Sequence, residues 1–130
     1  MIKKIIVTTT LVIVVAVFFS ATRTNYTHIE QDKVADIILE NPDAIILDVR
    51  TQEEYERKHI PHAVLSPIEN LREGDFSAIP DKNKVILIYC WTGRRAEDSA
   101  KILVENGYKN IYEFGGLVEW KGKVEGTEVD

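Results

Sequence analysis

The expected fold follows from the stretch Val85-Ile86-Leu87-Ile88-Tyr89-Cys90-Trp91-Thr92-Gly93-Arg94-Arg95. An unbroken apolar run leads to the only cysteine of the chain, and a helical pattern begins at about Arg95. This order predicts a buried strand, a short loop and the start of a helix. A thiol in such a loop meets unpaired backbone N–H groups, the positive end of the helix dipole and guanidinium charge, all of which stabilise a thiolate. We therefore predict that Cys90 is a nucleophile.

The rest of the chain alternates between apolar runs of strand length and patterns with helical spacing. Strands are expected at residues 26–29, 44–49, 63–65, 85–89 and 111–114, and helices at 30–40, 51–58, about Leu71, 95–106 and around Val118 and Trp120. Such alternation implies crossover connections, and so a mainly parallel central sheet with helices on both faces. The expected fold class is a three-layer α/β fold, in which sites lie beyond the carboxyl ends of the strands.

Two local signals mark helix ends. Thr51 and Glu54 have the spacing of a capping box, which starts the helix that runs to Lys58. Gly107 follows the helical pattern of residues 95–106, and we expect it in the left-handed conformation that ends a helix.

Composition and charge exclude several classes of protein. The net charge is −5 and the chain has no basic stripe with interleaved aromatic residues, so we expect no nucleic-acid partner. A single cysteine rules out an intrachain disulfide, and no Cys/His cluster has metal-ligand spacing. We therefore expect no metal and no cofactor.

The N-terminal segment has the layout of an export signal. Lys3 and Lys4 precede the mostly apolar run Ile5–Phe19, whose purely apolar part, Leu11–Phe19, is short for a bilayer span. Residues 1–21 are predicted to be a signal peptide or a membrane anchor, and this segment is the only expected contact with a membrane. We expect a linker at 22–26, the globular domain at 27–124 and a C-terminal tail at 125–130. The domain would lie in the periplasm or otherwise outside the cytoplasmic membrane.

Four groups of residues, taken in order, resemble the rhodanese (sulfurtransferase) domain. They are Leu47-Asp48-Val49-Arg50 with Glu54-Tyr55; His59-Ile60-Pro61 with Ala63; Tyr89-Cys90 with Gly93 and Arg95; and Gly115-Gly116 ahead of Trp120. The resemblance covers about Thr27 to Lys121. It implies a rhodanese-like three-layer fold and a sulfurtransferase in which Cys90 takes a sulfane sulfur from a small anion, thiosulfate or a persulfide, and passes it to a thiol or cyanide.

The sequence departs from the family pattern at two places. The hydroxyl residue that usually follows the loop arginine is replaced by Ala96, so one contact to the loop is missing. Lys58 and His62 stand where the family has glycines around His59. We interpret His59 as a structural residue rather than a partner of Cys90.

Residues 90–95 are the candidate site. Their backbone N–H groups can converge on a sulfur atom, and Gly93 permits the tight curvature. We assign substrate binding to the five residues after the nucleophile, Trp91, Thr92, Gly93, Arg94 and Arg95. Arg95 is also expected to make the loop rigid.

Two charged residues are expected to support this loop. Asp48 ends a predicted strand, as Cys90 nearly does, so both can face one crevice. Asp48 and Arg50 are assigned to structural support of the loop rather than to proton transfer.

The sequence limits the possible sulfur acceptors and leaves two rival functions. With no second cysteine, the sulfur acceptor must be external, either a small thiol or a thioredoxin-like protein. One rival is a non-catalytic binding module of the same fold. The other is a phosphatase or arsenate reductase, but its longer Cys-x5-Arg loop would need an arginine where this chain has Ala96.

Overall fold

The computed structural model describes residues 25–129 and contains one five-stranded sheet. Its strands are β1 (Tyr26–His28), β2 (Ile45–Asp48), β3 (Val64–Leu65), β4 (Val85–Cys90) and β5 (Asn110–Gly116). They lie in the order β1-β5-β4-β2-β3, and every neighbouring pair is parallel. The predicted parallel sheet is confirmed. The predicted export segment, residues 1–21, lies outside the described residues.

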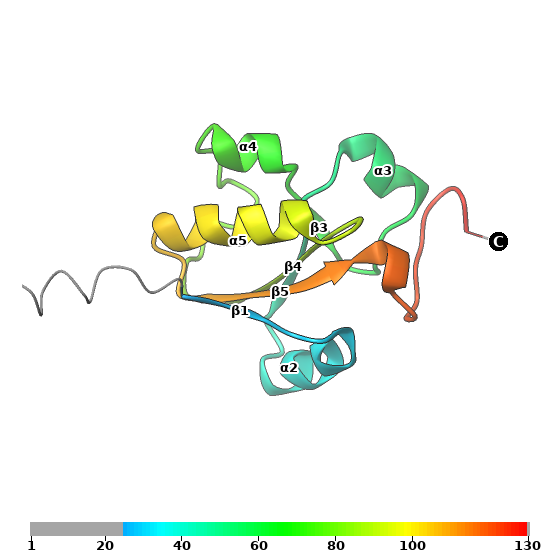
Figure 1. The fold of residues 1–130 in the computed structure, drawn as a ribbon, viewed down its shortest axis with the longest axis horizontal. Coiled ribbons are helices and arrows are strands. Elements are labelled where there is room, and N and C mark those ends of the chain that lie inside the picture. Colours follow the sequence, from blue (N-terminus) through cyan, green and yellow to red (C-terminus); the bar gives the residue numbers. More distant parts are fainter. Residues whose placement is uncertain (1–24, 130) are drawn as a thin grey trace, which may run out of the picture.

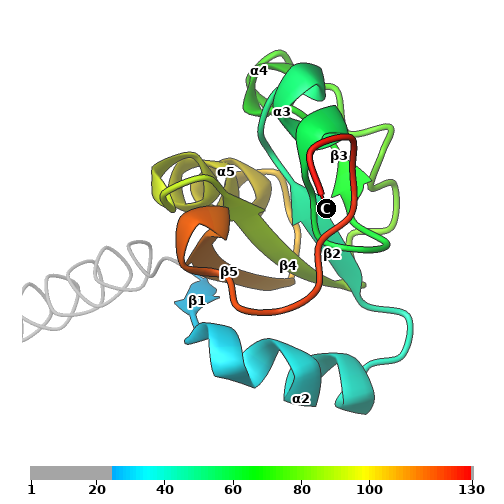
Figure 2. The ribbon, with the colours of Figure 1, turned by 90° about the vertical axis from the view of Figure 1, so that its right-hand side faces the viewer.

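Helices cover both faces of the sheet (Figure 1). The helical elements are η2 (Gln31–Lys33), α2 (Val34–Glu40), α3 (Gln52–Arg57), α4 (Ile68–Arg72), α5 (Arg94–Glu105) and η3 (Leu117–Glu119). α4 and α5 lie on one face and α2 on the other, and the view in Figure 2 shows the same separation. The three-layer α/β class is therefore confirmed.

The core is built around β4, which is the middle strand of the five. Ile86, Ile88 and Cys90 pack toward α4 and α5, whereas Leu87 and Tyr89 pack on the opposite side with residues of α2. All five are at most 1% exposed. Burying a large aliphatic side chain contributes about 1.5–3 kcal/mol, so this strand is a main source of stability. Its position at the centre of the sheet holds the cysteine on a rigid element.

The two predicted helix signals are confirmed. The side-chain oxygen of Thr51 accepts a hydrogen bond from the backbone N–H of Glu54, and the Glu54 carboxylate accepts one from the backbone N–H of Thr51. Gly107 follows α5 with a φ of +87°, in the left-handed region. Local sequence therefore fixes where α3 begins and where α5 ends.

The predicted final helix is wrong in extent. η3 is a single 3-10 turn, and Trp120 already has extended backbone angles. The Trp120 ring lies 5.7 Å from the Phe114 ring, and its Nε1–H donates to the carbonyl of Lys123 at 3.1 Å. These contacts pack the indole against the core, and the backbone leaves the helical conformation at Trp120.

The C-terminal segment packs along α3. Backbone N–H groups of Thr127 and Glu128 donate to the carbonyls of Glu56 and Arg57, at 3.0 Å in both cases. They satisfy carbonyls that a helix C-terminus otherwise leaves unpaired. None of the helices among residues 25–129 is both long and apolar enough to cross a membrane.

Candidate active site

Cys90 is the last residue of β4 and lies beneath the start of α5. Its residue surface is 1% exposed. Gly93, with a φ of +109°, turns the chain so that its own N–H donates to Cys90 Sγ at 3.0 Å. α5 begins at the next residue, so the sulfur lies at the N-terminal end of a 12-residue helix, where the helix dipole favours negative charge. The arrangement suits an anionic sulfur.

The loop rests on two glycines of β5. A Cβ atom at Gly116 would lie 2.0 Å from the carbonyl oxygen of Trp91, a distance that no side chain can occupy. A Cβ at Gly93 would lie 3.1 Å from the Cα of Gly115. The N–H of Val118 donates to that same Trp91 carbonyl at 3.2 Å. Gly115 and Gly116 therefore form the floor of the Cys90 loop.

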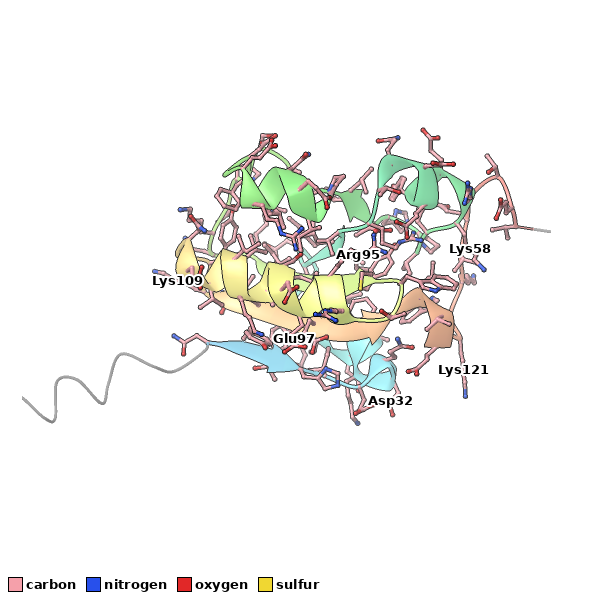
Figure 3. The ribbon with its side chains drawn as sticks, turned by 45° about the horizontal axis from the view of Figure 1, so that its top comes forward. Asp32, Lys58, Arg95, Glu97, Lys109 and Lys121 are labelled. Atoms are coloured by element: carbon pink, nitrogen blue, oxygen red, sulfur yellow. The ribbon has the colours of Figure 1, made fainter. Side chains whose placement is uncertain are left out.

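Arg95 ties the loop to α3. Its guanidinium donates two hydrogen bonds to the Glu54 carboxylate, at 2.8 and 3.0 Å, and Figure 3 shows Arg95 between α5 and α3. The two side chains are 34% and 29% exposed. These hydrogen bonds from Arg95 are the main cause that lowers the pKa of Glu54 to about 2. These hydrogen bonds join the start of α5 to α3, and loop rigidity from Arg95 stays a prediction. Glu54 was predicted only as a capping residue.

The Glu54–Arg95 pair should make stability depend on pH. Because folding lowers the pKa of Glu54 from 4.5 to about 2, its contribution is present above about pH 4.5 and disappears as the pH falls toward about 2. Glu54→Gln should cost about 1 kcal/mol at neutral pH, after allowance for solvent screening. Urea unfolding of both proteins between about pH 7 and about pH 2 measures the difference. A difference that stays constant over this range would contradict the assignment.

Asp48 and Arg50 form a buried ion pair behind the loop. Arg50 is 3% exposed and donates through Nη2 to Asp48 at 2.8 Å and to the carbonyl of Lys58 at 2.6 Å. The Tyr89 hydroxyl donates to the same carboxylate at 2.6 Å and accepts the N–H of Ile60 at 3.1 Å. The network therefore joins the residue before Cys90 to the end of α3. Tyr89 is a member that sequence reasoning missed.

Tyr89 stays a hydrogen-bond donor under ordinary conditions. Burial, followed by the negative charge of Asp48, raises the pKa of its phenol. The hydroxyl therefore remains protonated and can keep donating to the carboxylate. This fixed donor holds Tyr89, and with it the start of the Cys90 loop, against the Asp48–Arg50 pair.

The mouth of the site lies between the loop and α3. Trp91 is 41% exposed, and Thr92 and Arg94 are exposed beside it. A pocket of about 310 Å³ adjoins Trp91 and is lined by Arg50, Glu54, Arg57, Lys58, Trp91 and Glu128. Its lining carries three cationic and two anionic side chains, and Arg50 is already paired with the buried Asp48 carboxylate.

Comparison with known proteins assigns the chain to a family. The sequence profile of the rhodanese-like domain matches residues 30–123. The chain belongs to the rhodanese-like domain family. This match confirms the resemblance predicted from the four groups of residues around Asp48, His59, Cys90 and Gly115.

Curated relatives of this rhodanese-like domain include two thiosulfate sulfurtransferases. PspE of Escherichia coli (strain K12) is 37% identical over 71 residues, which cover 55% of this chain and 68% of the relative. GlpE of Coxiella burnetii (strain RSA 331 / Henzerling II) is 38% identical over 85 residues, covering 65% of this chain and 78% of the relative. The crystal structure of a rhodanese-like domain protein from Staphylococcus aureus superimposes with a TM-score of 0.66 at 28% identity, covering 78% of this chain and 98% of that one.

The contacts of His59 in this rhodanese-like domain are with α3 and the C-terminal segment rather than with the Cys90 loop. Its Nδ1 donates to the carbonyl of Tyr55 at 2.6 Å, and its ring stacks on the Tyr55 ring at 3.7 Å. Its Nε2 lies 3.1 Å from the Glu125 carboxylate. These contacts join α3 to the C-terminal segment, as a structural residue would. Within residues 25–129, no group of three or more His, Cys, Asp or Glu side chains is arranged to hold a metal ion.

Proposed function

We propose that this protein is a sulfurtransferase that carries a sulfane sulfur as a persulfide on Cys90. The observation that supports it most is the N–H of Gly93 pointing at Cys90 Sγ from 3.0 Å at the start of α5. Backbone donors preorganised in this way stabilise an anionic sulfur without reorganisation during the reaction. The thiosulfate sulfurtransferases among its relatives support the same reaction class.

In the first half-reaction the donor gives up one sulfur atom. The Cys90 thiolate attacks the outer sulfur of thiosulfate, the S–S bond breaks, and sulfite leaves with the bonding electron pair. Cys90 now carries a persulfide whose terminal sulfur holds the negative charge. Because Cys90 is 1% exposed, a slender donor that presents a terminal sulfur suits the site better than a bulky one.

In the second half-reaction the sulfur passes to an external acceptor. A thiolate or cyanide attacks the terminal sulfur, the persulfide bond breaks, and the Cys90 thiolate is released. The chain has no second cysteine, so no internal thiol can take the sulfur. A small thiol or the exposed cysteine of a thioredoxin-like protein fits this role, approaching the persulfide beside the exposed Trp91.

Steady-state assays test the reaction directly. Purified protein should convert thiosulfate and cyanide to thiocyanate with saturable kinetics, and should release sulfite when a dithiol replaces cyanide. Parallel lines in double-reciprocal plots are expected for a reaction that passes through a persulfide enzyme. Failure to turn over with either acceptor would contradict the proposed activity.

We further propose that the domain works outside the cytoplasmic membrane. The support is the order of Lys3 and Lys4 ahead of the apolar run Ile5–Phe19. An alkaline phosphatase fused after Thr27 should be active, because that reporter folds only after export. A matched fusion should be inactive if it keeps Lys3 and Lys4 but has charged residues in place of the apolar run Leu11–Phe19. If the first fusion is inactive and a cytoplasmic reporter at the same site is active, the domain is not exported.

A further inference from the structure

The floor of the Cys90 loop is an irregular part of the sheet. Ile88 pairs with Glu113, but two residues later Cys90 pairs with Gly116, which is three residues beyond Glu113. β5 therefore carries one extra residue beside the cysteine, and Gly115 has a φ of +86° there. A bulge of this kind interrupts the ladder and re-aims the residues that follow. It also leaves backbone groups that need other partners.

A buried carboxylate supplies one of these partners. The Glu113 side chain is 8% exposed, and its Oε2 accepts the N–H of Gly115 at 3.1 Å. Its Oε1 is hydrogen-bonded to Nδ1 of His28 on the neighbouring strand β1. Removing a carboxylate from water is costly unless partners compensate it, so its placement under the bulge calls for an explanation.

Gln31 supplies the other partners. Its Nε2 donates to the carbonyl of Phe114 at 3.1 Å and to that of Gly116 at 2.8 Å. Glu113 thus accepts the backbone N–H of Gly115, and Gln31 donates to the backbone carbonyls on either side of it. Their hydrogen bonds reach residues 114–116 of β5 and not the catalytic loop itself, so we expect them to act on the loop through the bulge.

The bulge in turn fixes the loop by close contact. Gly116 has no room for a side chain beneath the Trp91 carbonyl, and a Cβ atom at Gly93 would lie 3.1 Å from the Cα of Gly115. A shift of the bulge by a few tenths of an ångström must therefore move Trp91 or Gly93. Gly93 is the residue whose N–H points at Cys90 Sγ.

We propose that Glu113, held by His28, and Gln31 are positioning residues that set the geometry of the Cys90 loop through the bulge at Gly115. The kinetic part of this inference rests on the proposed sulfur transfer, and its geometric part does not. The hydrogen bond to Glu113 is the main cause that raises the pKa of His28, which favours an imidazolium beside the carboxylate. Glu30 and Glu97 add negative charge near it, and Figure 3 shows Glu97 on the β1 side of α5.

The test compares four variants. Glu113→Ala removes the acceptor of the Gly115 N–H, whereas Glu113→Gln keeps an acceptor oxygen of nearly the same shape. Glu30→Gln is the matched control, because the Glu30 side chain is 83% exposed and its carboxylate also lies near His28, at 3.8 Å. Gln31→Ala provides a second perturbation from the other side, should Glu113→Ala fail to fold.

Two readouts are independent of sulfur transfer. In Glu113→Ala and Gln31→Ala the amide resonances of Gly93 and Trp91 should shift, and iodoacetamide should alkylate Cys90 about tenfold faster, the ratio expected for one lost hydrogen bond. Alkylation is measured at a pH high enough to ionise a cysteine thiol in every variant. Glu113→Gln should restore the wild-type rate within about threefold, and Glu30→Gln should match wild type.

The kinetic readout separates positioning from folding. kcat should fall about tenfold in Glu113→Ala while the KM for thiosulfate changes less, because the loop amides act most on the charge that develops on sulfur. The inference is overturned if Glu113→Ala and Gln31→Ala fold and leave the Gly93 amide and the alkylation rate unchanged. It is also overturned if Glu113→Gln behaves as badly as Glu113→Ala. If the amide and alkylation effects appear without any turnover in wild type, the positioning role stands and the proposed function fails.

Discussion

Cys90→Ser should abolish the transfer of sulfur from thiosulfate to cyanide. Serine has no thiolate that can attack a sulfane sulfur, and no second cysteine exists to replace it. The hydroxyl can still accept the N–H of Gly93, so the loop should keep its geometry. We expect a stability change of about 1 kcal/mol, since the thiol is buried but small.

The measurement is thiocyanate formation by wild type and Cys90→Ser, with thermal unfolding of both proteins. Cys90→Ala is the companion control, because it removes the acceptor of the Gly93 N–H as well as the nucleophile. Turnover above the uncatalysed rate in either variant would show that Cys90 is not the sulfur carrier.

Arg95→Ala should cause the second-largest loss of activity. Its removal leaves the Glu54 carboxylate without the two hydrogen bonds that hold α3 against the loop, and places an unpaired negative charge beside an anion site. Loss of a charged hydrogen bond corresponds to about 1.5–3 kcal/mol, or roughly a 10- to 150-fold fall in kcat/KM for thiosulfate. The free energy of unfolding should fall as well.

Arg94→Ala is the matched control for Arg95→Ala. Arg94 is exposed at the mouth of the site, so its loss should mainly raise the KM for the dianion. High salt should mask that effect, because exposed charges are screened over about 10 Å at 0.1 M ionic strength. Measuring kcat and KM for both variants at low and high salt separates the two roles. An Arg95→Ala protein with wild-type kinetics would contradict the role given to the ion pair.

Much of the fold could be predicted because its signals are local. The apolar run before Cys90 gives β4, the capping box of Thr51 and Glu54 gives the start of α3, and Gly107 gives the end of α5. Each signal depends on residues a few positions apart in the chain. The parallel order of the sheet followed from the alternation of strands with helices.

The supports of the site were harder to predict because they are not local. Glu54 and Arg95 are separated by 41 positions, as are Asp48 and Tyr89, and no pattern in the sequence marks these pairs. The bulge under Gly115 depends on the register between β4 and β5, which a sequence does not display. The short η3 turn has a similar cause, because the contact of Trp120 with Phe114 overrides the local helical pattern.

The family motif identified some of the residues that make these non-local contacts. Glu54 and the pair Gly115-Gly116 were quoted as motif residues, without a physical role for them beyond the capping box. The structure places all three against the Cys90 loop, Glu54 through Arg95 and the glycines by direct contact. These three motif residues therefore surround the Cys90 loop, whereas His59 joins α3 to the C-terminal segment.

The most direct test of the central claim is mass analysis of the protein after incubation with thiosulfate and removal of the excess. The persulfide account predicts that the intact mass rises by one sulfur atom, that the gain maps to the peptide containing Cys90, and that a thiol reductant removes it. Cys90→Ser treated in the same way should gain nothing. An unchanged mass in the wild-type protein, under conditions where it turns over thiosulfate, would contradict the persulfide on Cys90.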